Sequence, residues 1–328
     1  AGVLAADGGA LVAASGKALV RVRPADKKVE ALFELPFVPR GLCVGGAGFF
    51  LTGDADNTVV IYDRTGSLLK ALGEPGGAYA GAWRKERLVN PVGVALGPDG
   101  ALWVAEGRRN PKRLSKWEVA SGRCVYDKVG CPAYGSPGAG FEPAQPERWF
   151  GQRCQWHVDP ATGKAEIVSV LQKEEGHLRG KIEECLNYTF VHQGGRTFVL
   201  GMYKGTLVSE LMPDGSLRDL ALISDVHSLL YGLNWRRVPA YCDAVERRFP
   251  KAAFEKKYAD ESCRYVGVLW VDADGDGDFD SGEFQFLPEG SRLASFGWGL
   301  KLNDLTLRVP YRNEKKEEGV LTLRPEGY

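Results

Sequence analysis

Short apolar runs separated by glycine-rich turns recur along the whole chain. The clearest copy spans residues 93–106, where one apolar run leads into a Pro-Asp-Gly turn and a second run follows it. This pattern predicts a β-hairpin, because turn residues separate two strands of similar length. The same pattern returns in four further segments: residues 3–14, 41–54, 188–200 and 299–308.

A second pair of apolar runs around a glycine turn follows several of these hairpins, as in residues 59–70, 114–125 and 206–218. Four short antiparallel strands per unit, repeated at about 40 to 50 residues, are typical of a β-propeller. One such unit cannot bury both faces of its sheet, so the units must stack radially. We therefore expect an all-β propeller of about seven blades, within a range of six to eight. The runs that would begin a blade start near Val3, Gly41, Gly93, Cys154, Tyr188, Val266 and Gly299.

Two segments interrupt this repeat. The Gly/Pro-rich stretch 131–146 indicates a loop, and residues 237–260 indicate a small helical insertion that Pro250 divides. We expect residues 1–328 to form one propeller domain. The last unit ends near residues 319–324 without a fourth strand. Because an open edge invites pairing, we expect the remainder of a longer polypeptide, or a second subunit, beside this last blade.

The most specific motif is residues 272–283, which read D-A-D-G-D-G-D-F-D-S-G-E and fit the calcium loop D-x-D-x-D-G-x5-E. Gly277 stands where that loop turns sharply. An acidic solvated turn is the alternative. Carboxylates would come from Asp272, Asp274 and Asp276, a backbone carbonyl from Asp278, a water-mediated contact from Asp280 and a two-oxygen clamp from Glu283.

The flanks of the loop differ from those of an EF-hand, which has a helix on each side. Residues 265–271 are β-branched and aromatic, and residues 284–288 are short and end at a proline, so both indicate strands. We expect one Ca²⁺ that staples a loop between strands. Loops of weak affinity need millimolar calcium, which favours an extracytoplasmic location, periplasmic or secreted.

Composition narrows the function classes. Lys plus Arg and Asp plus Glu both number 42, and this balance argues against nucleic-acid binding. The chain contains no apolar run close to the roughly 20 residues of a membrane span. Seven cysteines occur without a C-x-x-C motif. Pairs 124–131 and 242–263 could close local loops, and reduced thiols fit equally well.

No local zinc motif, nucleophile elbow or phosphate loop occurs, but a propeller can still bring distant residues together at its axis. Loops before the first strand of each blade converge on the central channel of a propeller. The polar and aromatic residues in these loops are Arg40, Asn90, Arg153, Asn187, Tyr231, Asn234 and Trp298. Together these residues would suit an acidic sugar as ligand, although each residue alone also fits a structural role.

Residues 90–106 resemble an NHL-type propeller repeat. Three further segments, residues 154–163, 270–277 and 298–300, resemble motifs of large exported bacterial propeller proteins of the planctomycete type. The resemblance covers roughly residues 40–307 and implies a propeller fold with a calcium loop. It implies no particular activity, because NHL repeats occur in binding proteins, lyases and hydrolases.

We expect an exported calcium-binding β-propeller that recognises an extracellular ligand, with carbohydrate as the expected class. One alternative is a polysaccharide lyase or hydrolase, in which Tyr231 or His227 would be the base and Arg40 or Arg153 would neutralise a carboxylate. Another is a scaffold subunit of a larger assembly. The sequence leaves open whether the protein is an enzyme.

Overall fold

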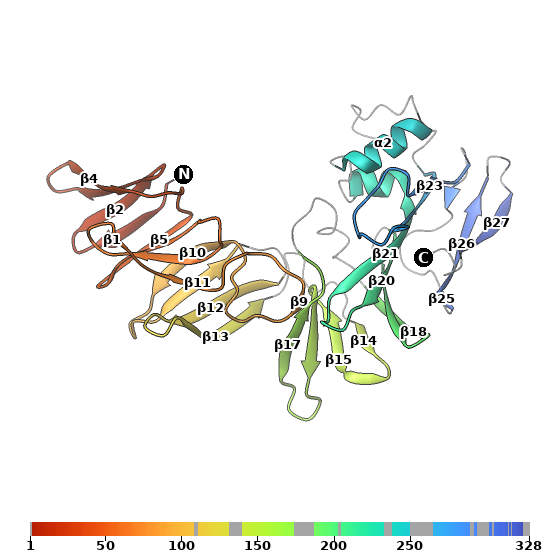
Figure 1. Ribbon diagram of the computed structural model, residues 1–328, viewed down its shortest axis with the longest axis horizontal. Helices are drawn as coiled ribbons and strands as arrows, with labels where there is room; N and C mark the ends of the chain where they lie inside the picture. The colour runs from red at the N-terminus through yellow and green to blue at the C-terminus, as the bar shows by residue number, and fades with distance from the viewer. Residues whose placement is uncertain are drawn as a thin grey trace. The chain divides into compact units, whose positions relative to one another are not determined.

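The computed structural model describes residues 2–107, 111–130, 140–173, 187–202, 205–232, 238–249, 265–288, 292–293, 302–303, 305–313, 315 and 317–323. The chain divides into two compact units. Unit 1 consists of Ala1–Tyr79 and Trp83–Gly135, and unit 2 of Ala80–Ala82 and Ser136–Tyr328. Both are built mainly from antiparallel strands (Figure 1).

Unit 1 contains three four-stranded sheets, in each of which every strand pairs with the next along the chain. The first sheet holds β1 (Leu4–Asp7), β2 (Ala10–Ser15), β3 (Ala18–Arg23) and β4 (Lys28–Glu34). The second holds β5 (Gly41–Gly45), β6 (Gly48–Thr52), β7 (Val59–Tyr62) and β8 (Leu68–Leu72). The third holds β10 (Pro91–Leu96), β11 (Leu102–Glu106), β12 (Lys112–Glu118) and β13 (Arg123–Gly130).

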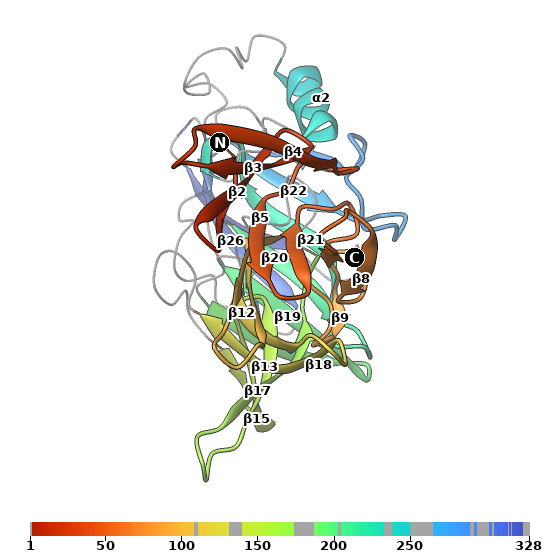
Figure 2. The same ribbon diagram turned by 90° about the vertical axis from the view of Figure 1, so that its left-hand side faces the viewer.

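The second sheet lies between the other two. Every residue of β6 and β7 is buried, because both faces of these strands pack against other sheets. The two strands accordingly consist of apolar residues apart from Thr52. Phe49 joins Val12 of the first sheet in one core, whereas Phe50 joins Trp117 of the third sheet in another. The first strands β1, β5 and β10 lie side by side (Figure 1). Figure 2 shows β5 next to β2 of the first sheet. Within unit 1, this is the arrangement expected of consecutive propeller blades.

Unit 2 contains the other three sheets. The fourth sheet holds β14 (Gly140–Glu142), β15 (Gln145–Gly151), β16 (Cys154–Val158) and β17 (Ala165–Val170), with β9 (Gly81–Ala82) beside β17. The fifth holds β18 (Asn187–Gln193), β19 (Arg196–Met202), β20 (Thr206–Leu211), β21 (Leu217–Asp225), β22 (Gly267–Val271) and β23 (Phe284–Phe286). The sixth holds β24 (Arg292–Leu293), β25 (Leu302–Asn303), β26 (Thr306–Arg312) and β27 (Glu318–Leu323).

The described residues thus form six sheets, and the expected seven blades are not confirmed. Two of the expected first strands are wrong. Cys154 begins β16, the third strand of its sheet, because β14 and β15 come from the end of the Gly/Pro-rich stretch that indicated a loop. The run at Val266 leads into β22, which continues the fifth sheet by pairing with β21. Gly299 lies outside the described residues.

The insertion predicted over 237–260 contains one described helix, α2 (Pro239–Arg248), and residues 250–264 lie outside the described part. Pro239 is tolerated in the first turn of α2 because a backbone N–H at that position would have no hydrogen-bond partner within the helix. A short π-helix, η1 (Ser228–Gly232), follows β21. No described helix is both long and apolar enough to cross a membrane. Cys124 and Cys242 are free thiols, and Cys131 and Cys263 lie outside the described residues.

Candidate calcium site and strand-start cluster

The acidic loop 272–283 closes the hairpin between β22 and β23, and Trp270 pairs with Phe284 across its base. Gly275 and Gly277 adopt positive φ angles of 79° and 73°, a conformation that glycine reaches without a steric penalty. Gly277 is therefore the turn residue that the calcium-loop pattern requires. The flanking elements are strands, as the sequence predicted.

Three carboxylates converge inside this loop. One oxygen each from Asp272, Asp274 and Asp276 lie within 4.8 Å of one another. Asp272 is only 6 % exposed. Its Oδ1 accepts hydrogen bonds from the backbone N–H groups of Gly275 (3.1 Å) and Gly277 (3.3 Å). Its buried Oδ2 has no hydrogen-bond partner, and a buried anionic oxygen without a partner is unfavourable unless a cation neutralises it.

Glu283 joins the two ends of the loop. Its Oε1 accepts the backbone N–H of Ala273 at 2.7 Å, and its Oε2 accepts the indole N–H of Trp270 at 2.9 Å and the backbone N–H of Asp280 at 3.2 Å. Carboxylate oxygens have further lone pairs, so these bonds leave Glu283 capacity for an ion. Among the described residues the three-aspartate group does not include Asp278, Asp280 or Glu283.

Two of the predicted ligand residues meet in unit 1. Arg40 immediately precedes β5 and Asn90 immediately precedes β10, and the Arg40 guanidinium donates a hydrogen bond from Nη1 to Oδ1 of Asn90. The backbone N–H of Asn90 donates to Oδ1 of Asn57 at 2.8 Å. We refer to Arg40, Asn57 and Asn90 as the strand-start cluster.

Asn57 was missed by the sequence reasoning. Both Asn57 and Asn90 have positive φ, 58° and 49°, a conformation in which asparagine is several-fold enriched. An asparagine in a turn beside the start of a strand is therefore the signal that could have identified Asn57. Arg40 is exposed and Asn90 is half-buried, so the guanidinium remains accessible to a ligand.

Arg153 lies elsewhere than predicted. It is 3 % exposed, in the turn between β15 and β16 with φ of 64°, and its Nη2 donates to the Lys173 carbonyl at 3.2 Å. It therefore precedes a third strand rather than a first strand. Together with Gln172 and Ser209 it lines a small cavity in unit 2. Asp219 accepts hydrogen bonds from Gln172 Nε2 (2.8 Å) and Ser209 Oγ (2.8 Å).

His227 lies two residues after the end of β21. It is half-buried, and its ring centroid is 6.3 Å from that of Tyr265. The neighbouring Asp225 accepts the backbone N–H and hydroxyl of Ser228 at 2.8 and 2.6 Å, and burial raises the pKa of its carboxyl group. The backbone of Tyr231 belongs to η1, and π-helical turns are frequent at functional sites. Asn234, Trp298 and the side chains of Asn187 and Tyr231 lie outside the described residues.

Comparison with known proteins assigns no family. No family model matches the chain, and no curated protein matches it. Among solved structures, a nidogen/laminin complex shares 16 % identity at a TM-score of 0.32, covering 64 % of this chain and 75 % of that one. Kuenenia stuttgartiensis hydrazine synthase shares 13 % identity at 0.31, covering 98 % and 95 %.

A protein named as a candidate gluconolactonase shares 14 % identity with this chain at a TM-score of 0.28, covering 66 % of this chain and 80 % of that one. Similarities this distant identify neither a family nor a function.

Proposed function

We propose that this protein is a calcium-binding β-propeller module of the NHL-like kind. The observation that carries the calcium assignment is the buried, unpartnered Oδ2 of Asp272 beside the oxygens of Asp274 and Asp276. Oxygen-only ligands suit Ca²⁺, which accepts six to eight oxygens, better than Zn²⁺, which prefers nitrogen and sulfur. Asp278, Asp280, Glu283 and water would complete the shell.

The ion would have a structural role: it would keep the loop 272–283 closed. Without a cation, the carboxylates of the loop repel one another, and this repulsion opposes the closed conformation. With a cation, the loop would hold β22 and β23 together at the end of the fifth sheet. The affinity expected of an extracellular calcium module is about 0.1 to 1 mM, so this assignment goes together with an exported protein, periplasmic or secreted.

Thermal unfolding with and without calcium tests the site. Calcium at 100 times its Kd would stabilise the folded protein by about 2.7 kcal/mol, and we expect Asp276→Ala to abolish the resulting shift in Tm. Glu166→Ala, which removes one charge from the exposed face of β17 in the same unit, should leave the shift intact. A calcium-dependent shift that survives in Asp276→Ala would refute the assignment.

The propeller arrangement is supported within each unit. In unit 1 the three first strands are neighbours, and in unit 2 β14 lies beside β18, which are the first strands of two consecutive sheets.

One face of the first sheet, opposite the core shared with the second sheet, carries an apolar row. Leu4 and Val29 on this face are 60 % and 68 % exposed. Since each sheet of a propeller packs between two others, we propose that a further blade covers this face.

We further propose that the strand-start cluster contributes to an extracellular ligand site, with carbohydrate as the ligand class. The supporting observation is the hydrogen bond from Arg40 to Asn90, which joins a guanidinium to an amide at the starts of neighbouring first strands. A guanidinium pairs with a carboxylate and an amide pairs with hydroxyl groups. Carboxylate and hydroxyl groups occur together in acidic sugars.

Binding to a panel of neutral and acidic oligosaccharides, with mass detection of products, tests this role. We expect an acidic oligosaccharide to bind unmodified and Arg40→Ala to weaken that binding at least tenfold, because a charge-assisted contact contributes about 1.5–3 kcal/mol. Arg64→Ala is the matched control, since Arg64 lies at the opposite strand ends, bonded to Asp7 and the Gly45 carbonyl. Equal loss in both variants would contradict the proposal, and cleaved products would favour a lyase or hydrolase.

A further inference from the structure

We propose that the ion in loop 272–283 also fixes the position of α2 and η1, through an aromatic side chain of the loop itself. This inference rests on the calcium site proposed above and adds a second consequence of its occupation. The coupling residue is Phe279, which stands between Asp278 and Asp280 in the acidic segment.

Phe279 is half-buried and packs against the core of unit 2, although the residues before and after it are exposed carboxylates. Its ring centroid lies 4.5 Å from that of Trp270 and 6.0 Å from that of Phe284, and the Phe279 and Phe284 rings are nearly parallel at 13°. Trp270 is the penultimate residue of β22, the strand before the loop, and Phe284 is the first residue of β23, the strand after it. The loop is therefore anchored to both strands by one ring.

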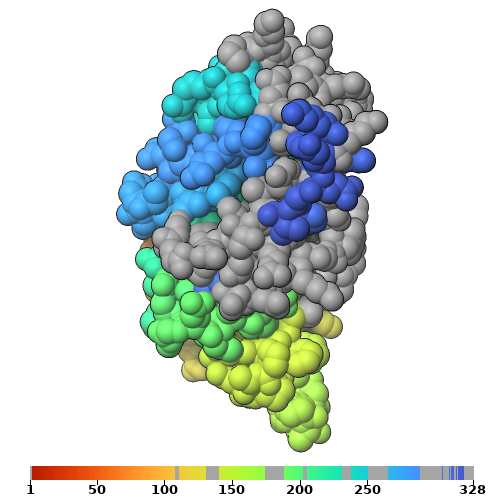
Figure 3. All heavy atoms as spheres, turned by 90° about the vertical axis from the view of Figure 1, so that its right-hand side faces the viewer, coloured from red at the N-terminus to blue at the C-terminus, as the bar shows by residue number. Residues whose placement is uncertain are grey.

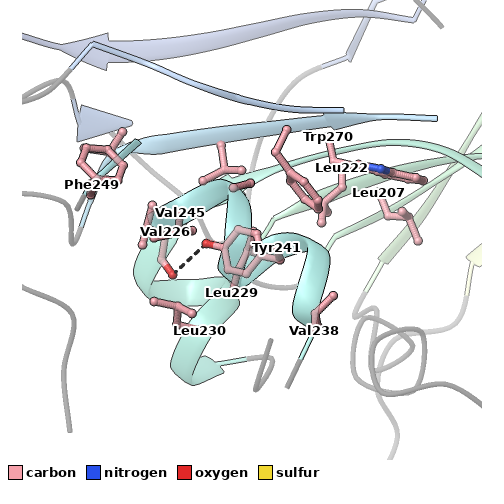
Figure 4. Close-up of a cluster of buried hydrophobic side chains, with 14 residues drawn as sticks. Leu207, Leu222, Val226, Leu229, Leu230, Val238, Tyr241, Val245, Phe249 and Trp270 are labelled. Carbon is pink, nitrogen blue, oxygen red and sulfur yellow. Dashed lines mark hydrogen bonds between the residues drawn. The ribbon is translucent and has the colours of Figure 1, made fainter. Parts of the chain in front are cut away.

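The same aromatic contacts continue into α2 and to Phe249, the residue directly after it. The Phe284 ring meets the Tyr241 ring edge-on at 5.3 Å, and Phe286 meets Phe249 in the same way at 5.6 Å. Tyr241 and Val245 of α2 share one buried core with Trp270, and the Tyr241 hydroxyl donates to the Val226 carbonyl at 3.4 Å (Figure 4). The segment 265–288, in blue, adjoins α2, in cyan, on the surface of unit 2 (Figure 3).

This core also includes Leu229 and Leu230 of η1 (Figure 4). The π-helix carries the backbone of Tyr231, and His227 stands directly before it. The calcium loop, α2 and the segment that holds both candidate bases therefore depend on one apolar cluster.

A polar contact adds to the aromatic ones. The indole N–H of Trp270, a residue 1 % exposed, donates to Oε2 of Glu283, which is the expected two-oxygen clamp of the loop. When the ion draws the carboxylates together, Glu283 stays against Trp270, and the Phe279 ring stays packed on the rings of Trp270 and Phe284. When the ion leaves, repulsion between the carboxylates opens the loop, and the cluster beneath α2 loses Phe279. Calcium occupancy therefore sets how often α2 and η1 detach from the sheet.

Hydrogen exchange of the full chain, with calcium and with chelator, measures this coupling. We expect calcium to slow amide exchange in α2 and in residues 226–232 by about tenfold, because those amides exchange through local opening of this core. Strand β2 in unit 1 serves as the internal control, and its exchange should not respond to calcium.

Phe279→Ala should retain calcium binding, since no oxygen ligand is removed, while the calcium-dependent protection of α2 is lost. Phe279→Leu keeps an apolar side chain and should retain part of the protection, which provides a second variant if the alanine form folds poorly. Calcium binding without any change in α2 exchange in the unaltered protein would overturn the coupling and leave the calcium site standing. Failure of the unaltered protein to bind calcium would overturn both.

Discussion

Asp272 and Arg153 show how burial changes the meaning of a charged residue. Both belong to sites predicted from sequence, and both are almost fully buried. For Asp272, burial strengthens the prediction, because its unpartnered Oδ2 lies beside two further carboxylates. For Arg153, burial weakens a direct role in ligand binding, because the residue is only 3 % exposed and precedes β16, the third strand of its sheet, rather than a first strand. Sequence spacing alone does not distinguish these outcomes.

Glu210 supports a prediction about pH. The Arg196 guanidinium bonds both oxygens of Glu210, at 2.7 and 2.8 Å, and Arg218 bonds Oε2 at 2.6 Å. The hydrogen bond from Arg196, with that from Arg218, lowers the pKa of Glu210 from 4.5 to about 2. A lowered folded-state pKa stabilises the protein above the unfolded value, and this contribution is lost as the pH falls from about 4.5 to 2.

We therefore expect Glu210→Gln to be less stable than the unaltered protein near pH 6 and to approach it as the pH falls towards 2. Urea unfolding at a series of pH values measures the difference. Glu166→Gln, at an exposed position of β17, is the control and should show a small difference throughout. A Glu210→Gln penalty that stays constant across the pH range would contradict the assigned role of Arg196.

The hairpins are the elements that sequence predicted best. Residues 41–54 form β5 and β6 with Gly41 opposite Thr52, and residues 93–106 form most of β10 and all of β11. These predictions succeed because alternating apolar runs and a glycine turn are local signals. The order of strands in a sheet is not local. Asp225 pairs with Gly267 across the whole insertion, and nothing in either segment specifies the other as its partner.

The hairpin of β5 and β6 gives a matched pair of glycine substitutions, because Gly46 lies in its turn and Gly48 is the first residue of β6. Gly48 has φ of 141°, and a Cβ atom there would lie 1.9 Å from the Tyr62 carbonyl oxygen, whereas a Cβ at Gly46 would meet nothing within 4 Å. We expect Gly48→Ala to destabilise the protein by at least about 2 kcal/mol and Gly46→Ala to change stability by less than about 0.5 kcal/mol. Chemical unfolding measures both. Equal effects would show that the strand register differs from the one described.

On the scale of the whole molecule, the β class and the repeated four-stranded sheets were predictable, because apolar runs recur at a regular spacing. The expected count of about seven blades, within a range of six to eight, is not confirmed, and the described residues form six sheets. The Gly/Pro-rich stretch 131–146 indicated a loop, so β14 and β15 were not predicted. The apolar run of β22 resembled the start of a new blade, although β22 continues the fifth sheet. Of the predicted ligand residues, Arg40 and Asn90 come together, since both immediately precede first strands. Arg153 precedes the third strand of its sheet and is therefore not one of the residues at the start of a first strand.

The measurement that tests the account most directly is a crystal structure of this chain grown in calcium, with anomalous data to identify the ion. We expect one calcium peak in loop 272–283, bound by oxygens of Asp272, Asp274 and Asp276 at about 2.3 to 2.6 Å. Oδ2 of Asp272 should be one of the ligands, because it is the buried oxygen without a hydrogen-bond partner. An ordered loop with the same closed conformation and no peak in saturating calcium would contradict the central claim.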